Sequence, residues 1–254
     1  ISKLGAKFYN IDITKKQDVD KIFSSNNFDG VYHLAGKAGV RASLDDPASY
    51  FNVNVYGTAN ILDACVKNNV KNIVFASSSS VYGEVGKEKV KEDRVLNPIS
   101  PYAMSKLCAE KCSKIFGETY GLKIAITRFF TVYGPHGRPD MAIAKFTKKI
   151  LKGEEIEIYG DGSQTRDFTY VDDIVQGLIL CMEKKAFGVF NLGCDNPVSV
   201  NELVKIIETI TGKTAVVKYT GKKKGDVSNT HADITKAKEM LGFEPKYSIR
   251  TGVK

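Results

Sequence analysis

Short apolar runs alternate with longer amphipathic stretches over the first two-thirds of the chain. Val31–Leu34, Asn72–Phe75 and Lys123–Thr127 are apolar and short, as expected for buried strands. Ala48–Asn68 and Pro101–Tyr120 have the length and pattern of helices. Because strands that alternate with helices form parallel sheets covered on both faces, we predict an α/β fold with a doubly wound parallel sheet.

The second predicted helix has clear signals at both ends. Ser100 is a favourable N-cap, Pro101 suits the first turn, and Gly121 suits the position just past the last turn. Ligands of such sheets bind at the carboxyl ends of the strands. The serine run Ser77–Ser80 directly follows a predicted strand, so we expect it at that edge.

The pattern changes about halfway along the chain. Gly134–Asp140 is a turn-rich loop, and Met141–Lys152 is a lysine-bearing helix followed by the short segment Glu155–Tyr159. Ser199–Glu202 has the spacing of a capping box and predicts a helix that Gly212 ends. These features indicate a smaller second lobe of α/β type that binds the substrate.

We expect this second lobe to be mixed with returning elements of the first. Residues 1–132 with 168–195 would form the larger lobe, and residues 133–167 with 196–254 the smaller one. A chain of 254 residues is long enough for this arrangement.

The composition is that of an ordinary globular protein, with 43% hydrophobic and 26% charged residues. The sequence contains no apolar run near the roughly 20 residues of a membrane helix, and we expect no signal peptide. The five scattered cysteines favour a reducing cytoplasm over a disulfide framework. Cys108 and Cys112 share a helix face, but a second ligand pair does not follow, so we expect no metal site.

The formal net charge is +8, which suits either nucleic acid or an anionic small molecule. The lysines are spread along the chain, and the sequence has neither a nucleic-acid-binding motif nor a basic stripe interleaved with aromatic residues. We therefore expect an anionic substrate and neither a nucleic acid nor a membrane as partner.

Tyr102 and Lys106 lie four residues apart on a predicted helix and so project from one face. A lysine cation near a phenol favours the phenolate and lowers the tyrosine pKa from about 10. A serine from the preceding run can bind the same substrate oxygen. The combination predicts a site that moves a proton off a hydroxyl group.

These motifs together resemble the extended short-chain dehydrogenase/reductase family, and within it the NAD-dependent nucleotide-sugar epimerases. The resemblance covers nearly the whole chain and implies a Rossmann-like fold that binds NAD. Within the group, the segment from Arg128 to Ala142 resembles the epimerases that act on UDP-glucuronate. The other motifs are Tyr32–Gly36, Asn54–Thr58, Ser77–Gly83, Tyr102–Lys106 and Arg166–Asp173.

One part of the family pattern is missing from this sequence. The family begins with a strand, a glycine-rich turn and a helix that hold the cofactor pyrophosphate. The segment Gly36–Gly39 has the wrong spacing for this turn, and the chain starts with Ile1. We expect the fold to be truncated at its N-terminus, and this chain to bind NAD poorly.

The resemblance assigns the catalytic roles to three residues. Tyr102 would take the proton from the sugar 4-hydroxyl, and Ser78 would bond the 4-oxygen. Lys106 would lower the Tyr102 pKa and bind the nicotinamide ribose. The further cofactor contacts implied by the family are Asp12, Ile13, Leu34, Ala35, Gly36, Asn54 and Phe130.

The resemblance also assigns the substrate contacts. Thr131 stands where UDP-galactose epimerases typically have asparagine, which leaves room and a hydroxyl for a 5-carboxylate. Arg138 could bind that carboxylate. Arg166 would hold the diphosphate. The other substrate contacts would be Ser79, Ser80, Tyr159 beside uracil and Asp226 near the ribose.

Other functions remain open at this stage. A UDP-glucose/UDP-galactose 4-epimerase is one alternative, and a nucleotide-sugar-binding protein without catalysis is another. Related dehydratases and decarboxylases carry carboxylates within the segment that here reads Ser77–Ser80, so elimination and decarboxylation are disfavoured. Family members commonly form homodimers through helices that correspond to Ala48–Asn68 and Pro101–Tyr120, and we expect the same here.

Overall fold

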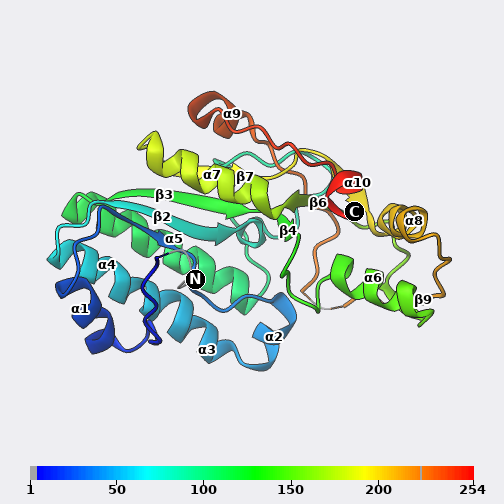
Figure 1. Ribbon diagram of the computed structural model, residues 1–254, viewed down its shortest axis with the longest axis horizontal. Helices are drawn as coiled ribbons and strands as arrows, with labels where there is room; N and C mark the ends of the chain where they lie inside the picture. The colour runs from blue at the N-terminus through cyan, green and yellow to red at the C-terminus, as the bar shows by residue number, and fades with distance from the viewer. Residues whose placement is uncertain (1–4, 224) are drawn as a thin grey trace.

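A four-stranded parallel sheet forms the centre of the larger lobe. The computed structural model describes residues 5–223 and 225–254. The strands run in the order β1 (Gly30–His33), β2 (Asn72–Ser78), β3 (Lys123–Phe129) and β7 (Gly188–Leu192), all parallel (Figure 1). The predicted parallel α/β sheet is confirmed. The strands β1, β2 and β3 are those expected from the apolar runs. Six consecutive residues of β2 are buried, as expected for a strand whose sheet is covered on both faces.

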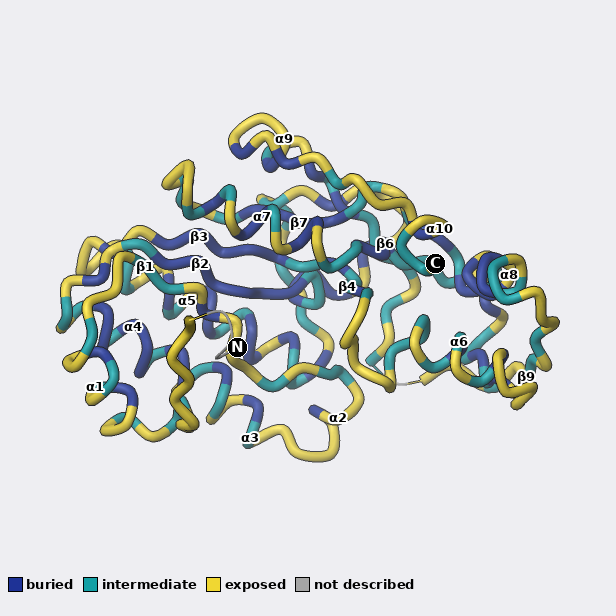
Figure 2. The backbone as a smooth tube through the Cα atoms, viewed as in Figure 1, coloured by how far each residue is buried: buried dark blue, intermediate teal, exposed yellow. Residues whose placement is uncertain are grey.

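Helices cover both faces of this sheet. Figure 1 shows α4 (Thr58–Lys67) and α5 (Pro101–Tyr120) on one side, with α1 (Lys16–Ser24) packed on α4. On the other side lie α7 (Val171–Glu183) and α9 (Thr235–Leu241). Two hydrophobic clusters fill the space between the helices and the sheet. The backbone of β2 and β3 is accordingly dark blue, or buried, in Figure 2.

The helix α5 has the bounds that the sequence predicts. The Ser100 hydroxyl accepts a hydrogen bond from the Ala103 N–H at 3.2 Å, and Pro101 occupies the first turn. Gly121 has a φ of 68°, the left-handed conformation that glycine adopts without a steric cost. These local signals fix where Tyr102 and Lys106 stand on the sheet.

The stretch predicted as one helix from Ala48 to Asn68 is built from three segments. They are α3 (Pro47–Phe51), a π-helical segment η2 (Asn52–Gly57) and α4. A π-helical turn accommodates an additional residue and is frequent at functional sites. Asn54, a predicted cofactor contact, lies within η2 and is 1% exposed.

Among the residues that the structure describes, the second lobe has two small sheets. The first contains β4 (Thr131–Tyr133), β6 (Thr165–Tyr170) and β8 (Pro197–Ser199), and the second pairs β5 (Ile156–Tyr159) with β9 (Val217–Thr220). The helices of this lobe, labelled at the right of Figure 1, are α6 (Ala142–Lys152), α8 (Val200–Thr211) and α10 (Ile249–Gly252). A third hydrophobic cluster joins these elements.

The predicted ends of α8 are confirmed. The Glu202 N–H donates to the Ser199 hydroxyl at 3.1 Å, and Gly212 closes the helix with a φ of 66°. Two short elements complete the description: α2 (Val40–Asp45) and the 3₁₀ turn η3 (Ser79–Tyr82). None of the helices within the described residues is long and apolar enough to span a membrane.

Candidate functional site

The first turns of α5 place Tyr102 and Lys106 against the carboxyl end of β2. Lys106 is 6% exposed, and its Nζ donates to the Ala76 carbonyl at 2.9 Å. The Ser78 side chain lies close enough to the Tyr102 hydroxyl to lower the tyrosine pKa. The structure therefore brings together the three residues that the sequence assigns to catalysis.

The environment moves the acid–base properties of these groups in opposite directions. Burial lowers the pKa of Lys106 to about 8, and Glu110 opposes this change. Burial raises the pKa of Tyr102, while Ser78 and the positive charge of Arg138 oppose that rise. The ammonium group of Lys106 is directed at Ala76, so its predicted effect on the Tyr102 pKa stays a prediction.

The serine run turns away from the strand at its edge, as expected. Ser78 is the last residue of β2 and stands opposite Phe129 of β3. Its hydroxyl accepts the Ser80 N–H at 3.2 Å and donates to the Ser80 hydroxyl at 3.1 Å. Ser79 and Ser80 are half-buried in η3. The tight turn thus keeps the Ser80 hydroxyl against Ser78, the serine that lies near Tyr102.

The backbone of Gly36 passes close to the side chains of Asn54 and Lys106. A Cβ atom at Gly36 would lie 2.9 Å from the Asn54 Oδ1 and 3.2 Å from the Lys106 Nζ. Asn54 is itself fixed, because it donates to the Ser105 hydroxyl and to the Lys37 carbonyl and accepts the Lys37 N–H at 2.7 Å. Glycine at position 36 therefore lets Asn54 and Lys106 approach the backbone more closely than any side chain would allow.

The donors of Lys106 suit the hydroxyl groups of a dinucleotide cofactor. Within the described part of the chain, the Ala76 carbonyl is the one hydrogen-bond acceptor of the Lys106 ammonium group, which has three N–H donors. The buried cation can therefore donate to ribose hydroxyls that reach the Gly36 backbone. Asn54 and Lys106 border the same point from η2 and α5.

The other predicted cofactor contacts lie in different surroundings. Asp12 is exposed, and its Oδ1 accepts from the N–H and hydroxyl of Thr14 at 2.9 Å each. Ile13 packs at Gly57, and Leu34 is 54% exposed just after β1, before the exposed Ala35. Phe130 is 4% exposed and belongs to the hydrophobic cluster under α7, where it contacts Tyr82. A nicotinamide contact by Phe130 stays a prediction.

Arg138 of the second-lobe loop lies near Tyr50, which packs against Tyr102. Its guanidinium lies 3.2 Å from the position of a Cβ at Gly39 and makes a two-point ion pair with Asp140. It is close enough to Tyr102 to oppose the rise of the tyrosine pKa. Thr131, half-buried, is the first residue of β4. The cation predicted to bind a sugar carboxylate therefore lies in the neighbourhood of the tyrosine predicted to react.

A second group of predicted contacts gathers around Tyr159 at the end of β5. Arg41 from α2 lies with its guanidinium 4.4 Å from the Tyr159 ring centroid and donates to Asp226 at 2.7 Å. Lys223 lies 5.0 Å from the same ring. Arg166 is close enough to Asp226 for that carboxylate to oppose the burial that lowers the arginine pKa. The three predicted nucleotide contacts thus lie around one cationic cluster.

The sequence arguments missed Arg41. The only available signal was its place five residues after Gly36, in a segment that leaves the carboxyl edge of the sheet. They also missed Glu110 and Arg128, a buried ion pair behind Lys106. A buried charge on α5 could have been suspected from its spacing of four residues after Lys106.

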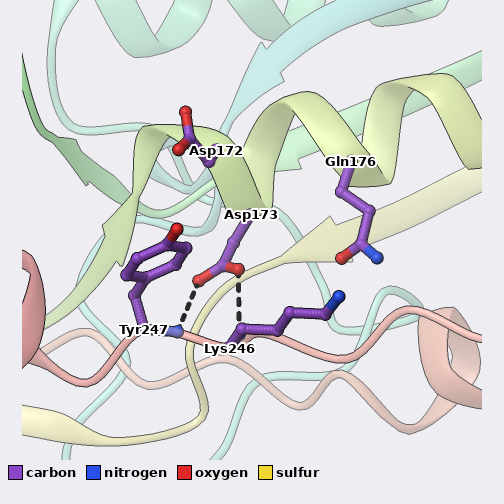
Figure 3. A pocket seen from close by; sticks show the side chains of 5 residues that line it. All are labelled: Asp172, Asp173, Gln176, Lys246 and Tyr247. Carbon is purple, nitrogen blue, oxygen red and sulfur yellow. Dashed lines mark hydrogen bonds between the residues drawn. The ribbon is translucent and has the colours of Figure 1, made fainter.

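The pocket of Figure 3 lies elsewhere, between α7 and the chain before α10. It has a volume of about 250 Å³ and is lined by Asp172, Asp173, Gln176, Lys246 and Tyr247. The Asp173 carboxylate accepts the backbone N–H groups of Lys246 and Tyr247, at 2.8 and 3.2 Å. This carboxylate ties down the C-terminal segment, and the pocket is lined by none of the predicted site residues.

Comparison with known families gives one match that spans most of the chain. The model of the NAD dependent epimerase/dehydratase family matches residues 2–193. Among curated proteins, a UDP-glucuronate 4-epimerase of Thermodesulfobacterium geofontis is 45% identical over 249 residues, which are 98% of this chain and 77% of the relative.

Two solved structures have the same fold. The UDP-glucuronic acid 4-epimerase of Bacillus cereus, in complex with UDP-glucuronic acid and NAD, aligns with a TM-score of 0.92 and 36% identity. The alignment covers 100% of this chain and 82% of that one. The UDP-glucose 4-epimerase of Thermotoga maritima with UDP-glucose aligns with a TM-score of 0.93 and 38% identity, over 98% of this chain and 82% of that one.

Proposed function

Since this chain belongs to the NAD dependent epimerase/dehydratase family, we propose that it is a 4-epimerase that interconverts UDP-glucuronate and UDP-galacturonate. The observation that carries the choice of substrate is that Arg138 and the Tyr50 hydroxyl both adjoin Gly39, and that the Tyr50 ring lies 6.2 Å from the Tyr102 ring between centroids. A guanidinium at this point can bind a carboxylate of the sugar whose hydroxyl reacts with the tyrosine. The relatives that act on UDP-glucuronate support the same choice.

The proposed reaction passes through a 4-keto sugar. Tyr102 removes the proton of the sugar 4-hydroxyl, and Ser78 holds the same oxygen through its hydroxyl group. NAD, when bound, supplies the oxidation at C4 and the reduction on the opposite face. Tyr102 then returns the proton to the 4-oxygen, so the enzyme ends in its starting protonation state.

Three groups would hold the cofactor next to this tyrosine. Lys106 donates its free N–H groups to the ribose, and the Gly36 backbone gives the cofactor room. Asn54 fixes the loop after β1 through its bonds to Lys37. The positive charge of Lys106 also favours the Tyr102 phenolate.

The substrate would lie between the two lobes. Arg138 and Thr131 bind the sugar carboxylate, and Arg166 binds the diphosphate. Tyr159 and Asp226 contact the uridine, and this requires Arg41 to leave the position that it occupies over the Tyr159 ring. Binding of an anionic substrate by these cationic groups would account for part of the net charge of +8.

We propose a division of the chain by ligand. Residues 1–132 with 168–195 would bind NAD, and residues 133–167 with 196–254 would bind the nucleotide sugar. The closeness of Gly36 to Lys106 and Asn54 supports the first assignment. The contact of the Arg41 guanidinium with the Tyr159 ring supports the second. α9 comes from the second set but packs on β7, so the hydrophobic cores do not follow the same boundary.

We also propose that the protein is a cytoplasmic homodimer that serves polysaccharide biosynthesis. Apolar side chains on α5 support self-association, since Met104 is 41% and Ile115 is 58% exposed. The free cysteines support a reducing compartment.

A direct assay tests the function. Purified protein with added NAD is incubated with UDP-glucuronate or with UDP-glucose, and the products are separated. Formation of UDP-galacturonate is expected. Conversion of UDP-glucose alone would establish the second candidate, UDP-glucose 4-epimerase, which the Thermotoga maritima structure supports. UDP binding without NAD binding or turnover would favour a nucleotide-sugar-binding protein without catalysis.

A further inference from the structure

Three consecutive residues of β2 meet three successive turns of α5. Tyr102 contacts Ser78, and Lys106 donates to the Ala76 carbonyl. One turn further, Glu110 accepts a hydrogen bond from the Ser77 hydroxyl. Residues spaced by four lie on one helix face, so this third contact continues the line of the catalytic pair.

Glu110 is held by a buried arginine. The Arg128 Nε donates to its Oε1 at 3.0 Å and Nη2 to its Oε2 at 2.8 Å, and the two side chains are 5% and 4% exposed. Arg128 also donates to the Tyr82 hydroxyl and to the Glu92 carbonyl, each at 2.9 Å. With both oxygens bound, the carboxylate is held in one orientation.

The presence of the buried Glu110–Arg128 ion pair is not explained by a contribution to protein stability. Removing two charges from water costs about as much as their attraction returns, so a buried ion pair is often no better than an apolar pair of the same size. The neighbour that gains from this one is Lys106, a buried cation that burial drives toward the neutral form.

The other ionisable groups described below carry no negative charge that could favour the protonated form of Lys106. His33 of β1 is buried and its pKa is lowered to about 4, so it is neutral near pH 7. Arg128 of β3 is a cation. Burial raises the pKa of Tyr82 in η3 to about 12, so this phenol is neutral near pH 7, and Tyr102 is the reacting group that Lys106 itself is proposed to assist. Glu110 is therefore the anion that faces this end of α5 among the described groups that shift Lys106.

We propose that Glu110 is a positioning residue that keeps Lys106 protonated and seated on β2, and that Arg128 fixes Glu110 in this role. The inference rests on the proposed function only in that the reaction uses Lys106 as a cation. Glu110 touches neither substrate nor cofactor; it acts through Lys106.

The test measures Lys106 directly. The protein is labelled with ¹³C-lysine, the Lys106 resonance is assigned with Lys106→Met, and its pKa is read from an NMR titration in Glu110→Gln. We expect this pKa to fall by about one unit, because an opposite charge near a buried group is removed. Glu118→Gln is the matched control, since Glu118 lies on the same helix in an exposed pair with Lys114. An unchanged Lys106 pKa in folded Glu110→Gln overturns the proposal.

A second variant covers the case in which Glu110→Gln does not fold with Arg128 unpaired. Glu110→Met combined with Arg128→Met removes both charges and should fold. Here the Lys106 pKa should fall by less than one unit, because a nearby cation is lost as well. A pKa equal to that of the wild type, or above it, contradicts the role of Glu110.

The activity gives an independent reading. The alkaline limb of the kcat profile should move to lower pH by about one unit in Glu110→Gln, a shift that a purely structural residue would not cause. If the protein turns over neither UDP-glucuronate nor UDP-glucose but the Lys106 pKa moves, the proposed function fails and the coupling stands. If turnover occurs and the Lys106 pKa does not move, the proposed function stands and the coupling to Glu110 fails.

Discussion

The guanidinium of Arg41 lies 4.4 Å from the ring centroid of Tyr159 and bonds Asp226 across the two lobes. The aromatic ring and the carboxylate proposed to contact uridine are therefore already occupied by a cation from α2. We therefore expect a bound nucleoside and Arg41 to compete for the same partners.

The first prediction concerns this competition. Arg41→Met should bind uridine about two- to fivefold more tightly than the wild type, since a cation–π contact of about 0.5–1 kcal/mol no longer has to be broken. Isothermal titration with uridine measures it, and Arg250→Met, exposed at α10, is the control. Weaker uridine binding in Arg41→Met would show that Arg41 is itself a ligand of the nucleoside.

The second prediction concerns the proton transfer. Tyr102→Phe should reduce kcat by about a hundredfold or more, because it removes the group that takes the proton from the sugar hydroxyl. UDP affinity should not change. Tyr120→Phe on the last turn of α5, where the side chain is 49% exposed, should retain the kcat of the wild type. Retained activity in Tyr102→Phe would exclude Tyr102 as the base.

The third prediction concerns the acidic sugar. Arg138→Gln should lower kcat/KM for UDP-glucuronate by about ten- to a hundredfold, the effect of one lost hydrogen bond to a charged group. Any conversion of UDP-glucose should change much less, because that sugar has no carboxylate. Equal losses for the two substrates would mean that Arg138 acts on Tyr102 or on the loop rather than on the carboxylate.

The fourth prediction follows from the lowered pKa of Lys106, about 8 in the folded protein against 10.5 for an ordinary lysine. Between these two pH values the unfolded chain binds more protons than the folded one at this residue, so this group makes stability rise with pH. Below about pH 8 Lys106 is protonated in both the folded and the unfolded chain, so this residue adds no dependence of stability on pH there. Lys106→Met should lose this part of the rise, which urea unfolding at pH 7.5 and at a pH near 10 would measure.

The fifth prediction concerns assembly. Ile115→Arg places a charge on the exposed apolar face of α5 and should convert a dimer into a monomer. Light scattering gives the mass of each form. Val95→Arg, at a side chain that is 84% exposed in a loop, should remain a dimer. A wild-type protein that is already monomeric would refute the homodimer.

The local features were readable from the sequence because each depends on neighbouring residues. The ends of α5 at Ser100 and Gly121 follow from capping and from the conformational freedom of glycine. The π-helical turn around Asn54 was not predicted, since it depends on the loop after β1 to which Asn54 is bonded. A periodic apolar pattern alone cannot distinguish it from a regular helix.

The sequence by itself determined the parallel α/β sheet, the helix that carries Tyr102 and Lys106, and the serine run at the edge of β2, because short-range periodicity and capping encode them. Only the tertiary structure decided which charges meet. Arg41 and Asp226 are 185 residues apart in the chain and bond at 2.7 Å, and Glu110 meets Arg128 only because α5 crosses β3. The strength of a charge interaction depends on distance and burial, and neither is set by position along the chain.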